Sequence, residues 1–418
     1  MAHIFTPKEA CAIVNMMAKE LTGQNDTIQA VDPSSFVSVG ERIITFPKEN
    51  VLGALTMSIF GTMVNVKRRQ ERLGLITQTD TALFKQIMKE ILVYSQEAQE
   101  SGAWNTDAKT NFAPGYDNGA NSGASVGTMW EQKPAVVAEL YFGGMSVWDD
   151  CLTVYEDQIK PAFTNMNDFL KLINGIKTEK ENDISREKDA YKTAVLVNFL
   201  AAIIDDANAN MKGSAVNLTS EFNTEFGTSY TTAELKTTYL KEFLQYYVAR
   251  LKNDSDRMAE ESVLYHWSPA KTVNGVSYVL NRQTPKADQR LLLYGPLFNK
   301  AQAQVMSEIF NPQYLEVSQG ERVAFWQNIN DPMKIKVTPA IPDFASAHGE
   351  AQQTGSEVNV DIVGALFDKD AVGINFFMDN ATATPMEARK RYHNVWYHMA
   401  RNGVNNFTRP AIVYYMAD

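Results

Sequence analysis

The chain has 418 residues, of which 44% are hydrophobic and 21% are charged, with a formal net charge of −10. This length allows two or three domain-sized units around a large core, and this balance argues against intrinsic disorder. The acidic excess argues against a dedicated nucleic-acid-binding protein, because a groove that follows phosphates leaves a basic signature, although a local basic patch stays compatible with it.

The two cysteines, Cys11 and Cys151, form neither a disulfide framework nor a metal-ligand spacing. We expect two buried thiols in a reducing compartment. The N-terminus lacks the basic head and apolar core of a signal peptide, and the longest apolar run, near 194–204, is too short to cross a bilayer. We therefore expect a soluble, unexported protein in which the sequon at Asn217 carries no sugar.

The first 65 residues predict two helices joined by an extended segment. Thr6–Glu9 reads as a capping box with proline at the first helical position, and a second helical pattern spans 48–63. Residues 24–46 read as extended. The basic run 67–72 is typical of a solvated charged turn, with contact to an acidic neighbour or to nucleic acid as the alternative.

Residues 84–144 predict a long hairpin arm. Strand patterns occupy 84–100 and 134–144, and the segment between them, APGYDNGANSGASVG at 113–127, is rich in glycine. It lacks the Gly-Lys-Ser/Thr ending and the strand-to-helix context of a phosphate loop, so it predicts a mobile loop. The arm has little apolar content of its own, and we expect it to lie on something outside itself.

Residues 164–208 show the strongest helical periodicity. Residues such as Phe169, Ile173, Ile184 and Val195 mark one broad apolar face, and 177–189 mixes both charge signs, as a solvated helix does. Without a break this helix would be roughly 65 Å long, and Gly175 is the candidate break. A helix so polar in its middle needs partners along its flanks or spans between two bodies.

The remaining elements predict an α+β fold. After a loop, a second long helix is expected to start at the capping box Thr231–Glu234. Strands are expected at 289–298 (with a Gly-Pro turn), 333–340, 357–367 and 411–418, and a helix at 385–402.

The predicted C-terminal helix contains ARKRYHNVWYHMARNG at 388–403. Thr384–Glu387 reads as its capping box and Gly403 as its stop. On a helix, His393 and His398 lie about 140° apart and cannot chelate one ion. They are then incidental to a structural helix whose packing face is Tyr392, Val395, Trp396 and Met399. Its basic cluster is at most an inter-subunit or DNA-side surface.

No catalytic constellation emerges from the sequence. The five histidines (His3, His266, His348, His393 and His398) have no zinc-protease spacing, and the chain lacks a nucleophile elbow and a dinucleotide fingerprint. Asp368–Asp370 predicts a polar turn rather than a cation site. The adjacent pairs Asp149-Asp150 and Asp205-Asp206 should point apart. We expect no catalytic, cofactor-binding or metal site; a metal-dependent enzyme is the alternative from another class.

Several phrases together resemble a known family. They are WEQKPAVVAELYFGGMSVWDDCLTVYEDQIKPAFTNMNDFLKLINGI, QRLLLYGPLFNKAQAQVMSEIFNPQYL, VGALFDKDAVGINFF, RYHNVWYHMARNG and the ending YYMAD. In order and content they resemble the major capsid proteins of tailed bacteriophages, and most of all those of short-tailed, phi29-like podophages. That resemblance implies the HK97-like (Hong Kong 97) capsid fold.

The resemblance also implies how the chain is divided. Residues 1–65 would form an N-terminal arm with helices, 66–145 an extended loop lying across a neighbouring subunit, and 146–210 a peripheral domain with a spine helix. Residues 211–345 would form an axial domain, and 346–418 the C-terminal strands and helix that close the core. A long cleaved N-terminal segment has no room before Pro7, which favours a separate scaffolding protein or none.

The implied function is that of a structural subunit of an icosahedral or prolate phage head. It would assemble with itself into hexamers and pentamers in the host cytoplasm, enclose double-stranded DNA with non-specific contacts, and end in the virion. A scaffolding protein, a portal and decoration or head-fibre proteins are the further partners expected, and no membrane or cofactor is. An encapsulin-like compartment, which shares the fold, is the nearer alternative.

Overall fold

The computed structural model describes residues 72–79, 88–94, 135–142, 146–155, 166–207, 209–269, 271–273, 276–305, 320–342, 352–385, 389–390 and 392–418, with the single residues Cys11, Asn15, Ser35, Val39 and Glu387. The expected helices at 6–23 and 48–63, the extended segment between them and the glycine-rich segment 113–127 lie outside these ranges. So does the basic run 67–72, except for Arg72.

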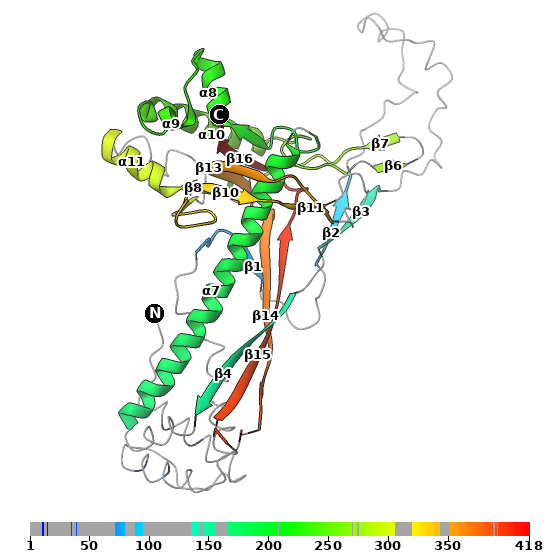
Figure 1. The fold of residues 1–418 in the computed structure, drawn as a ribbon. Helices are drawn as coiled ribbons and strands as arrows, with labels where there is room; N and C mark the ends of the chain where they lie inside the picture. Colours follow the sequence, from blue (N-terminus) through cyan, green and yellow to red (C-terminus); the bar gives the residue numbers. More distant parts are fainter. Residues whose placement is uncertain are drawn as a thin grey trace, which may run out of the picture.

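The long helix predicted near 164–208 is present as α7, Met166–Asp206. It has 41 residues, which correspond to about 60 Å, and Gly175 does not interrupt it. The apolar run near its C-terminal end is buried on nearly all sides, with Leu200, Ala201 and Ala202 at 0% exposure. This part of α7 enters the main core, whereas the earlier part of the helix extends away from it, as Figure 1 shows. In that earlier part some charged side chains are exposed and others, such as Lys180 and Asp189, are buried.

A four-stranded sheet runs beside the exposed part of α7 (Figure 1). Its strand order is β1-β14-β15-β4, with bounds Thr77–Thr79, Val372–Ala383, Tyr392–Asn405 and Ser146–Tyr155. Strands β14, β15 and β4 are antiparallel, and β1 is parallel to β14. We call this sheet, with the part of α7 up to about residue 192, the elongated arm.

The predicted helix at 385–402 is wrong, because most of this segment is strand β15. It is hydrogen-bonded to β14 on one side and β4 on the other along most of its length. Val395, Tyr397 and Met399 are buried while Trp396 between them is 37% exposed, which is the two-residue alternation of a strand. The expected capping box belongs instead to the β14–β15 turn, where Thr384 pairs with Asn394.

Gly403, expected as a helix stop, lies inside β15. A Cβ atom there would lie 2.5 Å from Val195 Cγ2 on α7. Glycine is therefore needed at this position because the helix and the strand approach each other closely.

The rest of the chain forms a body around a six-stranded sheet. Along the main path the order is β5-β16-β13-β8-β9, and β10 also pairs with β13. The bounds are Ala215–Asn217, Ala411–Met416, Val358–Asp368, Gln289–Tyr294, Gly320–Val323 and Lys334–Val337. The strands expected at 289–298, 333–340, 357–367 and 411–418 are thus confirmed, and β13 is the centre of the sheet.

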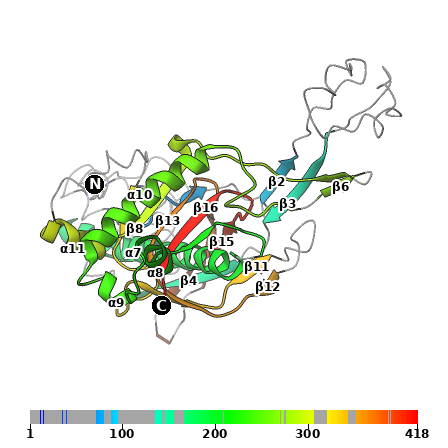
Figure 2. The ribbon, with the colours of Figure 1, turned by 90° about the horizontal axis from the view of Figure 1, so that it is seen from above.

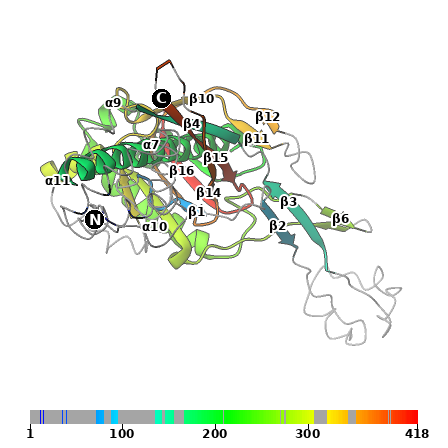
Figure 3. The same cartoon turned by 90° about the horizontal axis from the view of Figure 1, so that it is seen from below.

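Helices flank this sheet: α10 (Leu240–Ala259) lies on one side and the end of α7 on the other, as Figures 2 and 3 show. The capping box at Thr231 and Glu234 is confirmed, but it opens the one-turn helix α9 (Thr232–Leu235), and α10 starts later. The Gly-Pro pair expected to form a turn instead begins α11 (Gly295–Val305). Helix α8 (Leu218–Phe226) is capped by Asn217, whose side chain accepts from two backbone amides.

Three two-stranded ribbons complete the described structure: β2–β3 (Met88–Val93 and Val137–Phe142), β6–β7 (Lys271–Val273 and Val276–Tyr278) and β11–β12 (Ala340–Pro342 and Gln352–Thr354). The first confirms the predicted hairpin, whose strands pair antiparallel from Met88↔Phe142 to Val93↔Val137. Among the described residues, no helix has the length and apolar character needed to span a membrane.

Candidate assembly surfaces

The β2–β3 hairpin has one face buried on its own subunit. Leu92, Tyr94, Val136, Ala138 and Leu140 all belong to the main core. Tyr94 also donates a hydrogen bond from its hydroxyl to the Pro269 carbonyl at 2.8 Å. The base of the hairpin is therefore fixed to the body.

An ionic cluster, which we call the Glu90 clasp, reinforces this attachment. One carboxylate oxygen of Glu90 accepts from Arg409 at 2.7 Å and from Arg282 at 3.2 Å, and the other accepts from the Asn406 amide. Glu90 comes from the hairpin, whereas its three partners come from the body. Burial, and then the charge of Arg409, lowers the pKa of Arg282, so the two arginines depend on nearby carboxylates.

Asp368 is the second acidic group near the clasp. It accepts from the Thr284 hydroxyl at 2.8 Å, and Arg409 acts on it electrostatically. Burial raises the pKa of Asp368, mainly because the charged form loses its water. The clasp therefore joins the hairpin to the end of β13, the central strand of the body.

The other face of the hairpin is open. Ile91 is 58% exposed, Val93 61% and Val137 46%, and Val93 and Val137 lie directly opposite each other. These three apolar side chains, which we call the hairpin patch, form a surface that the described part of its own subunit leaves to solvent. This supports the expectation that the hairpin lies on something outside itself.

The elongated arm has a small core that is strengthened by charges. Phe376, Val395, Tyr397 and Met399 form a cluster of buried apolar residues separate from the main core. Lys180 of α7 is only 4% exposed and pairs with Asp150 of β4 at 2.5 Å, with its ammonium 5.1 Å from the centre of the Tyr397 ring. Burial, and then the charge of Asp150, raises the pKa of Tyr397 to about 12. Lys180 thus connects the helix to two strands.

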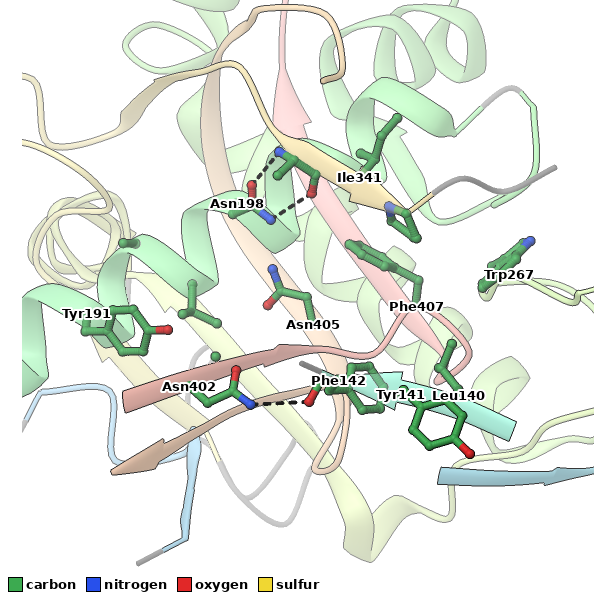
Figure 4. A pocket seen from close by; sticks show the side chains of 15 residues that line it. Leu140, Tyr141, Phe142, Tyr191, Asn198, Trp267, Ile341, Asn402, Asn405 and Phe407 are labelled. Atoms are coloured by element: carbon green, nitrogen blue, oxygen red, sulfur yellow. Dashed lines mark hydrogen bonds between the residues drawn. The ribbon is translucent and has the colours of Figure 1, made fainter. Parts of the chain in front are cut away.

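A cavity of about 350 Å³ lies where the hairpin, α7, β11 and the end of β15 meet (Figure 4). Apolar side chains such as Leu140, Ile341 and Phe407 line it. The Asn198 side chain forms two reciprocal hydrogen bonds with the Ala340 backbone, at 2.8 and 3.1 Å, and Asn402 donates to the Phe142 carbonyl. These amides form hydrogen bonds with the backbone of neighbouring elements. The cavity therefore lies at a packing interface between elements.

The histidines that the structure describes do not gather into a site. Both His393 and His398 belong to β15, five residues apart along the strand. His398 pairs with Asp149 at 2.6 Å on the exposed face. His266 lies in the body between the carbonyls of Leu264 and Leu280, and burial lowers its pKa. His3 and His348 lie outside the described residues.

The acidic pairs diverge as expected. Asp149 contacts His398 on one face of β4, and Asp150 contacts Lys180 on the other. Asp205 accepts from the Ser356 backbone, whereas Asp206 accepts from Asn210.

The Asp368–Asp370 segment is a polar turn, in which Asp368 accepts from the Asp370 amide and Lys369 pairs with Asp288. Within the described ranges, no three His, Cys, Asp or Glu side chains gather as a metal site would require. Of the two thiols expected to be buried, Cys11 is buried, whereas Cys151 on β4 is only half-buried.

Sequence reasoning did not identify the clasp. Glu90, Arg282 and Arg409 are far apart in the chain, and no local pattern relates them. The hairpin patch had a signal, because KEILVY ends in four successive apolar residues that include Ile91 and Val93, but the sequence alone does not say which face is buried.

A comparison with protein families matches residues 14–415 to the sequence model described as Phi29-like phage major capsid protein. No curated protein matches the sequence.

Among solved structures, the capsid of Staphylococcus phage Andhra is similar at 11% identity and a TM-score of 0.49, over 85% of this chain and 86% of that one. A chain in the structure of the head fibre and inner core protein gp22 of bacteriophage P68 has 11% identity and a TM-score of 0.48, over 84% and 89%. The capsid of cyanophage P-SCSP1u has 13% identity and a TM-score of 0.43, over 85% and 90%.

Proposed function

The chain belongs to the family of Phi29-like phage major capsid proteins, and from this premise we propose that its hairpin and elongated arm hold neighbouring copies together in the head shell. The protein is a coat subunit of a phage head, it associates with itself into capsomers, and it is a component of the virion. The elements described above are those expected of the HK97-like capsid fold: a hairpin, a long spine helix beside a sheet, and a mixed body. The family does not favour the encapsulin-like alternative.

The observation that carries the proposal is the two-sided hairpin. Its inner face and the Glu90 clasp fix it to its own body, while its outer face exposes Ile91, Val93 and Val137. A fixed base gives the outer face a defined direction, which lowers the ordering cost of a contact with a neighbour. Burying three aliphatic side chains stabilises one contact only modestly, but many such contacts act together in a closed shell.

We further propose the division of the chain that the resemblance implies. Residues 1–65 act as the N-terminal arm, 66–145 as the extended loop and 146–210 as the peripheral domain with the spine helix. Residues 211–345 act as the axial domain. In the segment 346–418, strands β14 and β15 join the arm sheet, while β13 and β16 complete the body sheet, so this segment links the two.

Membership of this family also suggests how the subunit assembles and with which partners. We propose hexamers and pentamers as capsomers, assembly in the host cytoplasm, and a separate scaffolding protein, portal and decoration or head-fibre proteins as partners. The net charge of −10 suits a shell that confines double-stranded DNA without binding it tightly, since tight binding would oppose packaging and ejection. The protein acts as a structural subunit and not as an enzyme.

Purified protein examined by negative-stain microscopy and sedimentation velocity tests this function. We expect shells, capsomer rings or polydisperse particles, formed by the chain alone or after a scaffolding protein is added. A protein that stays monomeric under all these conditions and turns over a substrate would contradict the proposal.

A further inference from the structure

Besides the hairpin patch, the body exposes several large apolar side chains, among them Phe226, Val279 and Ile329. Ile329 is 73% exposed, the highest value among the large apolar side chains that the structure describes. It lies in the loop 324–332, between β9 and β10. Exposed single isoleucines are common, so the surroundings of this one decide whether it has a role.

The loop around Ile329 is held in one shape by its own side chains. The Gln327 amide pairs with both backbone groups of Lys336, at 2.7 and 3.1 Å. Trp326 is buried; its indole donates to the Ile362 carbonyl and its backbone amide to the Pro332 carbonyl, both at 2.9 Å. A loop so constrained presents Ile329 in a fixed position, which is the property that a contact residue at an interface requires.

The loop and the hairpin lie at opposite ends of the body sheet. Trp326 contacts β13 at Ile362, near the start of that strand, and β9 enters the loop beside the first residue of α11. The Glu90 clasp lies beside Asp368, where β13 ends. Six residues of strand separate these points, or about 20 Å. Figure 1 shows the same separation, with α11 on one side of the body and β2–β3 on the other.

We propose that the loop 324–332 of one subunit seats Ile329 on the hairpin patch, Ile91, Val93 and Val137, of a second copy of this chain. Both surfaces are apolar and exposed, and each is rigidly held by its own subunit. They cannot meet within one chain because they lie at opposite ends of the sheet. A contact between two different surfaces of identical subunits is head-to-tail, and it generates a ring when the rotation closes. The proposal rests on the proposed function and names the surfaces that join neighbours in a capsomer.

Engineered disulfides test this contact directly. Ile329→Cys and Val137→Cys are combined in one chain, and the assembled protein is oxidised and run on a denaturing, non-reducing gel. Because each subunit would give one cysteine to each of two neighbours, we expect a ladder of three or more linked chains. A mixture of the two single variants should give linked dimers and nothing longer.

Matched controls separate this contact from chance. Ile329→Cys with Val147→Cys uses a side chain on the elongated arm that is 68% exposed, and should give no ladder. Wild-type protein treated with the same oxidant reports on Cys11 and Cys151. In parallel, Ile329→Asp should leave the circular dichroism spectrum unchanged and raise the protein concentration needed for assembly about tenfold or more.

Two outcomes would overturn the inference. Normal particles without a ladder in the double variant, or assembly of Ile329→Asp at the wild-type concentration, would show that neighbours meet elsewhere, and the capsid function would stand. Failure of the wild-type chain to assemble, with or without a scaffolding protein, would remove the proposed function and this contact with it.

Discussion

The body and the elongated arm are built by different means. The body surrounds one large apolar core, in which Leu366, Ile412 and Val413 have 0% exposure. The arm adds a separate cluster of four buried apolar side chains, together with ionic and cation–π contacts such as those of Lys180 with Asp150 and Tyr397. Within the part of the chain that the structure describes, this sheet packs against α7 and encloses only a small separate cluster. We infer that neighbouring subunits complete the stability of the arm, whereas the body folds on its own contacts.

The largest predicted loss of stability comes from a substitution in the core of the body. A side chain at Gly364 would overlap the Tyr247 hydroxyl and the Leu292 backbone, neither of which can move without disturbing the sheet. We expect Gly364→Val to lower the free energy of unfolding by about 3 kcal/mol or more, because overpacking forces the backbone to shift. Urea denaturation checks this value, and a variant as stable as wild type would show that the core adapts.

The next largest loss of stability is expected from a substitution that destabilises the arm and leaves the contacts of the body unchanged. Lys180→Met keeps the aliphatic stem but leaves Asp150 without its partner, and we expect a loss of about 2 kcal/mol, less than for a fully buried pair because Asp150 is 25% exposed. Arg186→Ala on the same helix removes an exposed pair with Asp183 and should have almost no effect. Equal losses in the two variants would mean that burial does not explain the role of Lys180.

A smaller loss of stability is expected when the hairpin is loosened from the body, and it should be distinguishable from the effects on the body core and on the arm. Glu90→Gln keeps the shape of the side chain but removes the charge that Arg282 and Arg409 share. We expect the global stability to fall by about 1 to 2 kcal/mol, with faster amide hydrogen exchange concentrated in 88–94 and 137–142. Unchanged exchange in these strands would show that the apolar inner face alone holds the hairpin.

The smallest effect concerns pH and the body. Burial lowers the pKa of His266, so at a pH below its ordinary value of 6.5 the unfolded chain binds a proton that the folded chain does not. Stability should therefore fall as the pH falls from 6.5 towards the lowered pKa. The loss between about pH 7 and about pH 5.5 should be larger in wild type than in His266→Gln, as measured by urea denaturation. An equal loss in both proteins would assign the acid sensitivity to other groups.

The sequence predicted secondary structure best where a clear hydrophobic periodicity or a local capping motif was present. The periodicity of 164–208 located α7, and the capping pair Thr231 and Glu234 was placed correctly. The helix prediction for 388–403 failed because Tyr392, Val395, Trp396 and Met399 are spaced like a helix face, although aromatic and β-branched residues such as the first three fit a strand equally well. Pairing with β4, more than 200 residues away, decides the outcome, and no local pattern reports it.

The candidate surfaces were predicted only in outline. The hairpin could be inferred from its strand patterns, and its need for an external partner stays a prediction. The Glu90 clasp joins residues 90, 282, 406 and 409, which meet only in the fold. The exposure of Ile329 likewise depends on Trp326 and Gln327 turning the loop outward. Surfaces of this kind are formed by residues that come together only in the tertiary structure. No periodic pattern in the sequence predicts them.

A cryo-electron-microscopy reconstruction of particles assembled from this chain tests the central claim most directly. We expect a closed shell in which each β2–β3 hairpin keeps its clasp to its own body and covers Ile91, Val93 and Val137 with a neighbouring subunit. Particles in which the hairpin contacts no neighbour and these three side chains face solvent would contradict the account.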